Sequence, residues 1–350
     1  MKLIELHILH SFPVTCLNRD DVGAPKSALF GGVPRARVSS QCWKRAIREL
    51  ATELQPSLFA GKRGHYVAEP LQEKLVAEGV PVDKARESAE AVATFLGKQD
   101  KKHKAEHKTS VALYLSPLEL RAIAKAIADE VRTGGKADVK KGAIKKAIEA
   151  APPRDHADIA IFGRMVADDH TLMLEGAGMF SHALSTHGVS NEIDFFSAVD
   201  ELKPEESEGA GHIGTLEFNS ACYYRYIGLN WDLLCDPDHL GHFSEDERKK
   251  VAEAFLRACI LAVPTARHNS MLGHNPPANV LALARSGQPL SLANAFEKPV
   301  RSRNGYVEES NKQMEDHFTA LSKTYGIQAT AFRIPDNSLD DLIEGVLGHA

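Results

Sequence analysis

The side chains best placed to act together lie in residues 16–50, where an irregular, glycine-containing segment leads into a predicted helix and positive charge accumulates. The bases that could converge near the helix start are Arg19, Lys26, Arg35, Arg37, Lys44, Arg45 and Arg48. Unpaired N–H groups at a helix start favour anions, and a row of bases on one helix face suits a phosphate backbone, where each contact adds a modest, salt-dependent increment. The pattern therefore predicts a phosphate-binding surface, and the alternative that the sequence leaves open is a solvated helix face.

The helix that would carry these bases is predicted to begin at Ser39 or Ser40, either of which can cap it. At 100° per residue, one apolar stripe is predicted to face the core. Its members are Trp43, Ile47, Leu50 and Leu54. The opposite face carries Gln41, Lys44, Arg45 and Arg48. This helix should therefore be buried on one side and cationic on the other.

Other candidate sites have weaker patterns. His103 and His107 have the i, i+4 spacing of a metal-binding pair, but no HExxH motif accompanies them, so we interpret them as a solvated helix face. The acid clusters at 20–21 and 168–170 are more typical of turn caps than of catalysis. The five cysteines are scattered and lack CxxC spacing, which indicates neither a disulfide framework nor a thiolate zinc site. The sequence predicts no catalytic residue, no metal and no cofactor.

Composition is that of a globular protein large enough for two or three structural units: 350 residues, of which 43% are hydrophobic and 25% charged. The formal net charge is −5, but it is unevenly distributed. Bases outnumber acids between residues 98 and 146, and acids outnumber bases between 192 and 253. Because no segment resembles a signal peptide or approaches the ~18 apolar residues of a membrane span, we expect a cytoplasmic protein.

The elements that must position the basic residues follow from hydrophobic periodicity. Strands are predicted at 2–10, 157–165, 215–230 and 278–284, and the helices of the core near 40–54, 244–263 and 308–325. Further helices are predicted at 85–96, 117–132 and 139–150, within a helical insertion. The order strand, helix, strand, strand, helix, strand is a split βαβ, so the predicted fold class is α+β with a ferredoxin-like, RRM-like core.

The segment 180–213 is longer than a simple connection requires and carries apolar residues among polar ones. These residues are Ile193, Phe195, Phe196 and Val199. They could form the tip of a protruding finger that wedges between bases or packs on a neighbour, or they could fold into a small cluster of their own. The sequence leaves both possibilities open.

Several motifs together resemble one family. They are "CLNRDD", "ALFGG" followed by "RVSSQCWKRA", "GRM", "THGVSNEIDFFSAVDEL", "GTLEF" with "YYRY", and "LSLANAFEKPV". In this order they are similar to CasC, the backbone subunit (Cas seven-type, RAMP superfamily) of the type I-E CRISPR surveillance complex Cascade. The match runs from the first strand to about residue 300 and is weak in the helical insertion and in the last fifty residues.

The resemblance implies a hand-like subunit with an RRM-like palm, an inserted helical fingers lobe and a protruding thumb hairpin. The implied divisions are palm residues 1–55, fingers 56–152, a palm strand within 153–180, thumb 181–213 and the remaining palm with C-terminal helices, 214–350. Such subunits polymerise along one CRISPR RNA, and the thumb displaces roughly every sixth nucleotide. Base pairing with target DNA then reads the sequence, while the protein holds the backbone.

The family's functional positions map onto specific residues of this chain. The resemblance implies RNA contacts by Arg19, Lys26, Ser39, Ser40, Gln41, Lys44, Arg45, Arg48, Arg164, Met165 and Lys298. It implies that the thumb residues Phe195, Phe196 and Val199 bracket the displaced nucleotide. Lys140, Lys141 and Lys145, in the weakly matching lobe, are a hypothesis for target DNA contacts.

The implied partners are CRISPR RNA, target DNA through guide pairing, neighbouring copies of the chain, and the other Cascade subunits. Those subunits are a 5′-handle cap, a small belly subunit, a large PAM-recognition subunit or a substitute, and a repeat-processing ribonuclease. The rival hypothesis is enzymatic, because type III relatives cleave target RNA with a loop aspartate and a divalent metal. Asp20, Asp21 and the 168–170 cluster are the candidates for that activity, and loss of magnesium-dependent cleavage in Asp21→Ala would support it.

Overall fold

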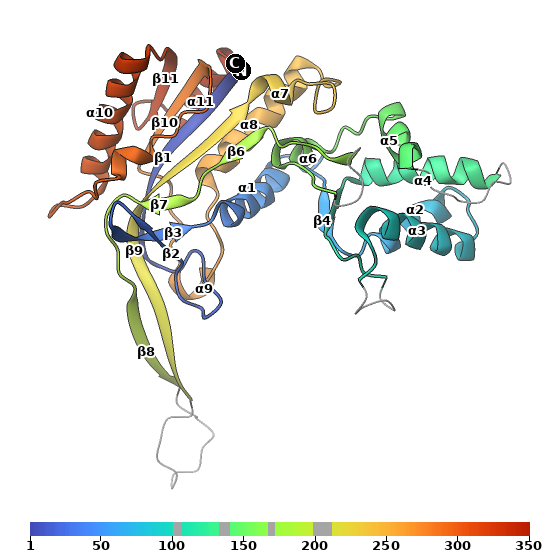
Figure 1. The fold of residues 1–350 in the computed structure, drawn as a ribbon, viewed down its shortest axis with the longest axis horizontal. Helices are drawn as coiled ribbons and strands as arrows, with labels where there is room; N and C mark the ends of the chain where they lie inside the picture. Colours follow the sequence, from blue (N-terminus) through green and yellow to red (C-terminus); the bar gives the residue numbers. More distant parts are fainter. Residues whose placement is uncertain (101–106, 133–140, 167–171, 199–211) are drawn as a thin grey trace, which may run out of the picture. The chain divides into compact units, whose positions relative to one another are not determined.

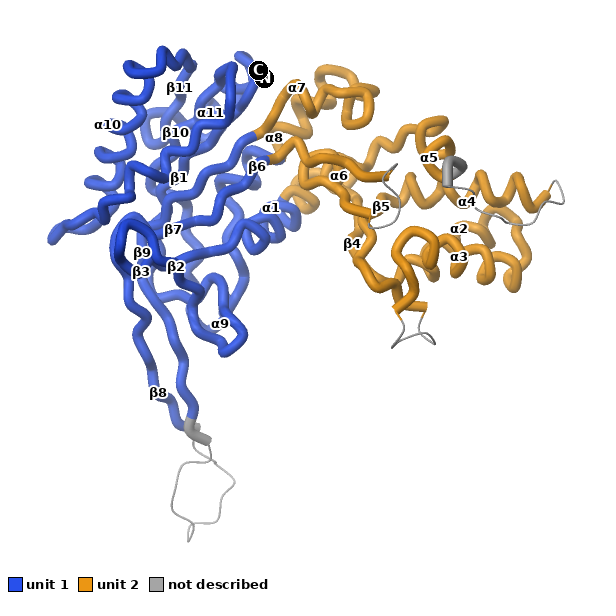
Figure 2. The backbone as a smooth tube through the Cα atoms, in the orientation of Figure 1, with its two compact units in different colours: residues 1–50, 179–228, 255–350 blue, residues 51–178, 229–254 orange. Residues whose placement is uncertain are grey.

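A computed structural model describes residues 1–100, 107–132, 141–166, 172–198 and 212–350. The chain forms two compact units (Figure 2). Unit 1 comprises residues 1–50, 179–228 and 255–350, and unit 2 comprises residues 51–178 and 229–254. None of the helices in these described segments is long and apolar enough to cross a membrane.

Unit 1 is built on a mainly antiparallel sheet (Figure 1). The strands of this sheet are β1 (Lys2–Thr15), β2 (Ser27–Phe30), β3 (Val33–Val38), β6 (Gly178–Phe180), β7 (Ala183–Ser185), β8 (Glu192–Ala198), β9 (His212–Asn230), β10 (Asn279–Ser286) and β11 (Ala329–Ile334). Their order is β11-β10-β1-β9-β7-β3-β2, with β6 and β8 also paired to β9. The helices that begin in unit 1 are α1 (Ser40–Leu54), α9 (His268–Met271), η3 (Ala293–Phe296), α10 (Val307–Tyr325) and α11 (Leu339–Gly348).

The central strands confirm the predicted α+β, ferredoxin-like core. The order β10-β1-β9-β7 places the first and third core strands side by side, and β1 runs antiparallel to β10 from Lys2 opposite Ser286 to Leu9 opposite Asn279. This is the arrangement of a split βαβ, in which α1 follows the first strand and α8 (Glu245–Leu261) precedes the last.

The burial of β1 differs from the prediction of a half-buried strand. Residues 3–10 are all buried, because both faces of this central strand are covered. Leu9 belongs to a core cluster with Phe296 of η3 and Met314 of α10. On the opposite face, the ring of Phe12 lies 4.0 Å from that of His10, which in turn lies 6.5 Å from the Trp43 ring of α1.

Polar side chains buried on β1 are paired with partners from β9 and β10. Glu5 accepts hydrogen bonds from the Tyr226 hydroxyl at 2.6 Å and from Arg285 at 2.9 Å. His7 Nδ1 lies 3.0 Å from the Tyr224 hydroxyl. These pairings offset the cost of burying polar groups, which is high when they lack partners.

The two histidines of β1 predict that stability falls in mild acid. Burial lowers the pKa of His7 to about 3, helped by the Arg285 charge, and lowers that of His10 to about 3, helped by Arg225. Between the ordinary histidine pKa of about 6.5 and that value, the unfolded chain binds protons that the folded chain does not. Each histidine should therefore reduce the free energy of unfolding by roughly 1 kcal/mol per pH unit as the pH falls through this window. Urea titrations of the wild type and of His7→Gln between pH 7 and 4 check this, and equal slopes for both proteins would contradict it.

Unit 2 is mainly helical. Its helices are α2 (Ala68–Ala77), α3 (Val82–Gly97), α4 (Pro117–Arg132), α5 (Lys141–Ala150), α6 (Ala157–Phe162) and α7 (Trp231–Leu234), and α8 begins in it. A two-stranded sheet of β4 (Lys62–Gly64) and β5 (Leu113–Leu115) accompanies them. One apolar core joins α2, α3 and α4, with Leu71, Val92 and Ile123 among its buried members. The predicted helical insertion is confirmed.

The predicted strand at 157–165 is wrong. Residues 157–162 form α6, and this segment belongs to unit 2 rather than to the palm sheet. Ala157, Ile159, Ala160 and Ile161 are all buried, and so is Asp158, so the segment has no exposed face that would reveal a helical period. Periodicity alone cannot distinguish a short, fully buried helix from a buried strand.

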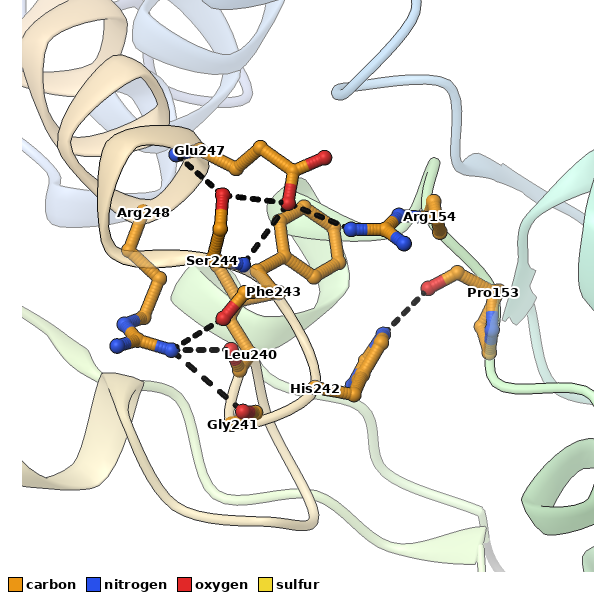
Figure 3. A network of polar contacts seen from close by, with 9 residues as sticks. All are labelled: Pro153, Arg154, Leu240, Gly241, His242, Phe243, Ser244, Glu247 and Arg248. Atoms are coloured by element: carbon orange, nitrogen blue, oxygen red, sulfur yellow. Dashed lines mark hydrogen bonds and ion pairs between the residues drawn. The ribbon is translucent and has the colours of Figure 1, made fainter.

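Helix α8, at the place of the helix predicted near 244–263, starts with a capping box of Ser244 and Glu247 (Figure 3). Ser244 N donates to Glu247 Oε2 at 2.8 Å, and Glu247 N donates to Ser244 Oγ at 3.3 Å. Glu247 also accepts a hydrogen bond from Arg154, and the neighbouring His242 Nε2 lies 2.8 Å from the Pro153 carbonyl oxygen.

Removing this cap should destabilise the protein. Ser244→Ala is expected to lower the free energy of unfolding by about 0.5–2 kcal/mol, because it removes the acceptor of the Glu247 N–H. Urea denaturation followed by circular dichroism measures the change. Ser57→Ala, at an exposed turn position of the same unit, is the matched control, and an equal effect of both substitutions would contradict the prediction.

Candidate nucleic-acid interface

The start of α1 is fixed by side chains on both sides of it. Ser39 is the N-cap: Cys42 N donates to Ser39 Oγ at 3.3 Å, and Ser39 N donates to Asn18 Oδ1 at 2.9 Å. Ser40 N donates to His182 Nδ1 at 3.3 Å. Ser39 is buried and its hydroxyl caps the helix, whereas Ser40 is half-buried.

On the inner face of α1, the Trp43 ring packs against the buried guanidinium group of Arg225. Trp43 is almost fully buried, and the Arg225 guanidinium carbon lies 3.9 Å from the centre of its ring. Arg225 donates to the Cys259 carbonyl at 3.2 Å and contacts His10 Nδ1 at 3.1 Å. Burial lowers the pKa of Arg225 to about 9. Of the stripe predicted to be buried, Leu54 is instead exposed and Leu50 is only half-buried, while Ala46 and Ala51 are buried.

Four bases gather around the outer side of the helix start, and we call them the α1 cationic cluster. They are Lys26, Arg37, Lys44 and Arg45. Burial raises the pKa of the Cys42 thiol, and the charges of Lys26 and Arg45 oppose that rise. Burial lowers the pKa of His182, and the charges of Arg37 and Lys26 lower it further. The cations thus surround the same end of α1.

The two bases of the first helical turns are held differently. Lys44 Nζ lies 5.0 Å from the centre of the Phe180 ring, and burial of its side chain lowers the pKa of Lys44. Arg45 is well exposed and pairs with Glu49 at 2.8 Å, an exposed contact of small worth that a phosphate can replace. Of the other predicted residues on this helix, Gln41 is exposed and Arg48 is half-buried.

The loop before β2 presents Arg19 and Lys26. Lys26 N donates to the Asn18 carbonyl at 2.9 Å, and Arg19 forms a bridge with Pro25, so the loop is closed at its base. The Asp20 carboxylate accepts N–H donors from Val22 at 3.0 Å and Ala24 at 2.9 Å. Asp20 therefore caps a turn, as adjacent acids commonly do, while Asp21 is exposed.

Arg35 does not join the cluster, so its predicted convergence with the other bases is wrong. Its side chain is buried and donates to the carbonyls of Phe30 at 3.1 Å, Ser185 at 2.9 Å and Phe296 at 2.8 Å. Arg37, two residues along β3 and therefore on the same face, is only half-buried, and its Nε donates to the Ser27 carbonyl at 3.1 Å.

Lys298 is exposed on a segment whose position is tightly fixed. At Gly31, which has a φ of 60°, a Cβ atom would lie only 1.6 Å from the Glu297 carbonyl oxygen. The β2–β3 turn therefore approaches the 296–298 backbone so closely that only glycine fits. Lys298 follows this contact directly.

The predicted thumb is an extended hairpin of β8 and β9 (Figure 1). Phe195 is 73% exposed, Ile193 58% and Phe196 40%. Val199 lies outside the described residues. The apolar side chains therefore do not fold into a buried cluster, which favours the protruding finger over the alternative.

The comparisons with known proteins identify the family. The Cas_CT1975 family model, described as CT1975-like protein, matches residues 4–341. The chain belongs to the CT1975-like family. A comparison with curated proteins finds no match.

Solved structures share the fold of this CT1975-like protein. A chain of a "CRISPR RNA-guided surveillance complex, pre-nicking" is 26% identical with a TM-score of 0.85, and the alignment covers 99% of both chains. A chain of a "CRISPR RNA-guided surveillance complex" is 23% identical with a TM-score of 0.75, covering 99% of this chain and 100% of the other. The second likeness supports the fold alone.

In unit 2 of the CT1975-like protein, one of the two predicted RNA contacts is buried and the other is exposed. The Arg164 side chain is only 8% exposed and pairs with Glu119 at 2.6 Å, and it also donates to the Leu172 carbonyl at 2.8 Å. Its Nε and Nη1 are thus engaged within the protein, and we leave it out of the proposed RNA surface. Met165 is 79% exposed and stays a candidate contact.

The lysines predicted for target DNA are only partly described. Lys140 lies outside the described residues, Lys141 starts α5, and Lys145 is half-buried beside Glu149 at 3.6 Å. Of the predicted histidine pair, His103 lies outside the described residues, and His107 lies in a turn with a φ of 49° rather than on a helix face. Asp168, Asp169 and His170 also lie outside them.

Sequence reasoning missed two residues of the interface, His182 and Phe180. His182 Nδ1 is an acceptor for both Ser40 N and Arg37 Nη1, and Phe180 supports Lys44. Both lie far from α1 in the sequence, so no local spacing could place them there. Among the described residues, no group of three or more His, Cys, Asp or Glu side chains could hold a metal ion.

Proposed function

We propose that this CT1975-like protein is a non-catalytic, guide RNA-binding backbone subunit of a type I-E CRISPR surveillance complex. The observation that carries the proposal is the α1 cationic cluster, four bases around a helix start that the buried residues Ser39 and Trp43 hold in place. The likeness to a chain of a CRISPR RNA-guided surveillance complex over nearly its full length supports it.

In this proposal the cluster binds guide phosphates. Arg19 and Lys298 extend it, and Ser40 and Gln41 contribute polar contacts at the helix start. Such contacts fix the position of the backbone and carry no sequence information, so binding is independent of the spacer sequence. The bases of the guide stay free to pair with target DNA.

The β8–β9 hairpin then acts as the thumb that kinks the guide at regular intervals, with Met165 as a further contact. Several copies lie head to tail along one RNA, because a hairpin that reaches a different surface on the next copy makes a heterologous contact that does not close on itself. The other partners are the remaining subunits of the complex named above.

The test is to express the chain with its CRISPR array and partner subunits, purify it through a tag and run the extracted nucleic acid on a denaturing gel. We expect a ribonuclease-sensitive band of one uniform length, with several copies of this chain per RNA. A well-folded protein without RNA would overturn the proposal.

The same preparation tests the enzymatic alternative. The backbone proposal predicts that complementary RNA stays intact in the presence of magnesium, and that Asp21→Ala retains guide RNA. Magnesium-dependent cleavage that disappears in Asp21→Ala would instead establish the type III-like activity.

A further inference from the structure

The two faces of the β8–β9 hairpin differ. Opposed residues of an antiparallel pair project to the same face. The pairs Phe195–Thr215 and Ile193–Glu217 therefore share one face, which we call the Phe195 face. The pairs Phe196–Gly214, Asp194–Leu216 and Glu192–Phe218 share the other, the Phe196 face.

On the Phe196 face, the phenylalanine ring lies across the opposite strand. A Cβ atom at Gly214 would be 2.4 Å from Phe196 Cζ and 2.8 Å from Cε1, distances that real Cβ atoms do not show. The ring thus occupies the space that any other residue at 214 would need. Its position across Gly214 gives this part of the hairpin a cross-strand contact that is otherwise scarce in a two-stranded ribbon.

On the Phe195 face, the apolar side chains are open. Phe195 lies opposite Thr215 and is 73% exposed, nearly twice the exposure of Phe196, and Ile193 is 58% exposed beside it. An aromatic ring presented in this way can stack on a nucleobase of any identity.

Charge also separates the faces. Glu192 and Asp194 are exposed on the Phe196 face and would repel a phosphate backbone. The Phe195 face carries one described acid, Glu217, whose Oε2 accepts a hydrogen bond from Asn191 at 3.1 Å. An approach of RNA to the Phe195 face therefore meets less repulsion.

We propose that Phe195 is the ring that contacts the displaced guide nucleotide, and that Gly214 and Phe196 form a brace that sets the twist of the hairpin. In this assignment Phe196 and Gly214 are positioning residues that act through Phe195. The inference rests on the proposed function, and it divides between the two faces the role that the sequence assigned to both phenylalanines.

The brace is tested in the free protein, without RNA. We expect the Gly214 Hα resonances, observed with selective glycine labelling, to be shifted upfield by the Phe196 ring. The shift should disappear in Phe196→Ala and persist in Phe195→Ala. An unchanged shift in Phe196→Ala would overturn the brace, whatever the fate of the proposed function.

The division of roles is tested in the assembled complex with 2-aminopurine placed at successive guide positions. Phe195→Ala should remove the quenching at the displaced positions and weaken guide binding by about tenfold, within the range for losing one base–aromatic stack. Phe196→Ala should lose only part of the quenching, because the Phe195 ring is still present but is positioned less well. Equal loss of quenching in both variants would overturn the assignment.

Gly214→Ala provides the sharpest comparison. Alone it should reduce quenching as Phe195→Ala does, because the new Cβ displaces the Phe196 ring and the hairpin with it. Combined with Phe196→Ala it should recover the level of Phe196→Ala, since the clash is gone. Gly188→Ala, whose Cβ would come no closer than 3.7 Å to any neighbour, is the matched control. Additive losses in the double variant would contradict the brace.

Failure of the brace can be distinguished from failure of the proposed function. A wild-type complex that retains no guide on a gel would count against the proposed function, while the glycine resonances would still decide the brace.

Discussion

Replacement of Lys44 and Arg45 together by alanine is expected to weaken guide RNA binding by about 25-fold at 0.1 M salt. Each phosphate contact to a single strand contributes about 0.7 to the slope of log affinity against log salt. Two lost contacts should therefore lower that slope by about 1.4, equally for guides of different sequence. Filter binding at a series of salt concentrations measures both quantities.

Two control variants make this result specific. Lys323→Ala removes an exposed base of α10, away from the cluster, and should leave the slope unchanged. Glu49→Ala frees Arg45 from its ion pair and should raise affinity slightly. The proposal of a phosphate-binding surface would be wrong if the double variant kept its slope or lost affinity for only some guide sequences.

Loss of the carboxylate of Glu119 is expected to destabilise unit 2 by about 3–5 kcal/mol. This carboxylate pairs with Arg164 at 2.6 Å and accepts Ser116 N at 2.8 Å, and both partners of the ion pair are buried. Glu119→Ala therefore leaves a buried guanidinium with carbonyl acceptors alone. Glu119→Gln, which keeps the shape and one acceptor, should lose less.

The two tryptophans allow each unit to be followed separately, because Trp43 lies in unit 1 and Trp231 in unit 2. In protein labelled with fluorotryptophan, the Trp231 resonance should reach its unfolding midpoint at lower urea in Glu119→Ala. Glu245→Ala, which breaks an exposed pair with Lys249, should not shift the midpoint. Equal midpoints for the two variants would refute the buried-pair argument.

Local periodicity predicted the long elements well. The helix expected from Ser39 or Ser40 is α1, capped by Ser39, and the predicted strand at 215–230 lies within β9. These elements have caps, an amphipathic pattern or a long aromatic-rich run, each of which is encoded by neighbours in sequence. The burial of both faces of β1 was not predictable in this way, since the elements that cover its second face, η3 and α10, follow hundreds of residues later.

The same limit applies to the charged residues. Sequence spacing identified Lys44 and Arg45 as outward-facing, but it could not separate Arg37 from Arg35, because both lie on one face of β3 and the carbonyls that bury Arg35 come from Ser185 and Phe296, far away in the sequence. Arg164 has a tertiary partner, Glu119, far from it in sequence. The contacts of a basic side chain in a motif must therefore be known before that side chain can be assigned to ligand binding.

The buried guanidinium of Arg225 has a consequence for how attraction reaches the surface of α1. Its hydrogen-bond partners in the described protein are carbonyl oxygens and an imidazole. These groups are neutral, so they do not cancel its positive charge. Mobile ions screen exposed charges strongly and buried ones much less. The electrostatic potential over the start of α1 thus has two sources: a surface part that counterions weaken, and an interior part that persists in concentrated salt. Evolutionary exchange of surface lysines would alter the surface part of the potential and leave the interior part unchanged.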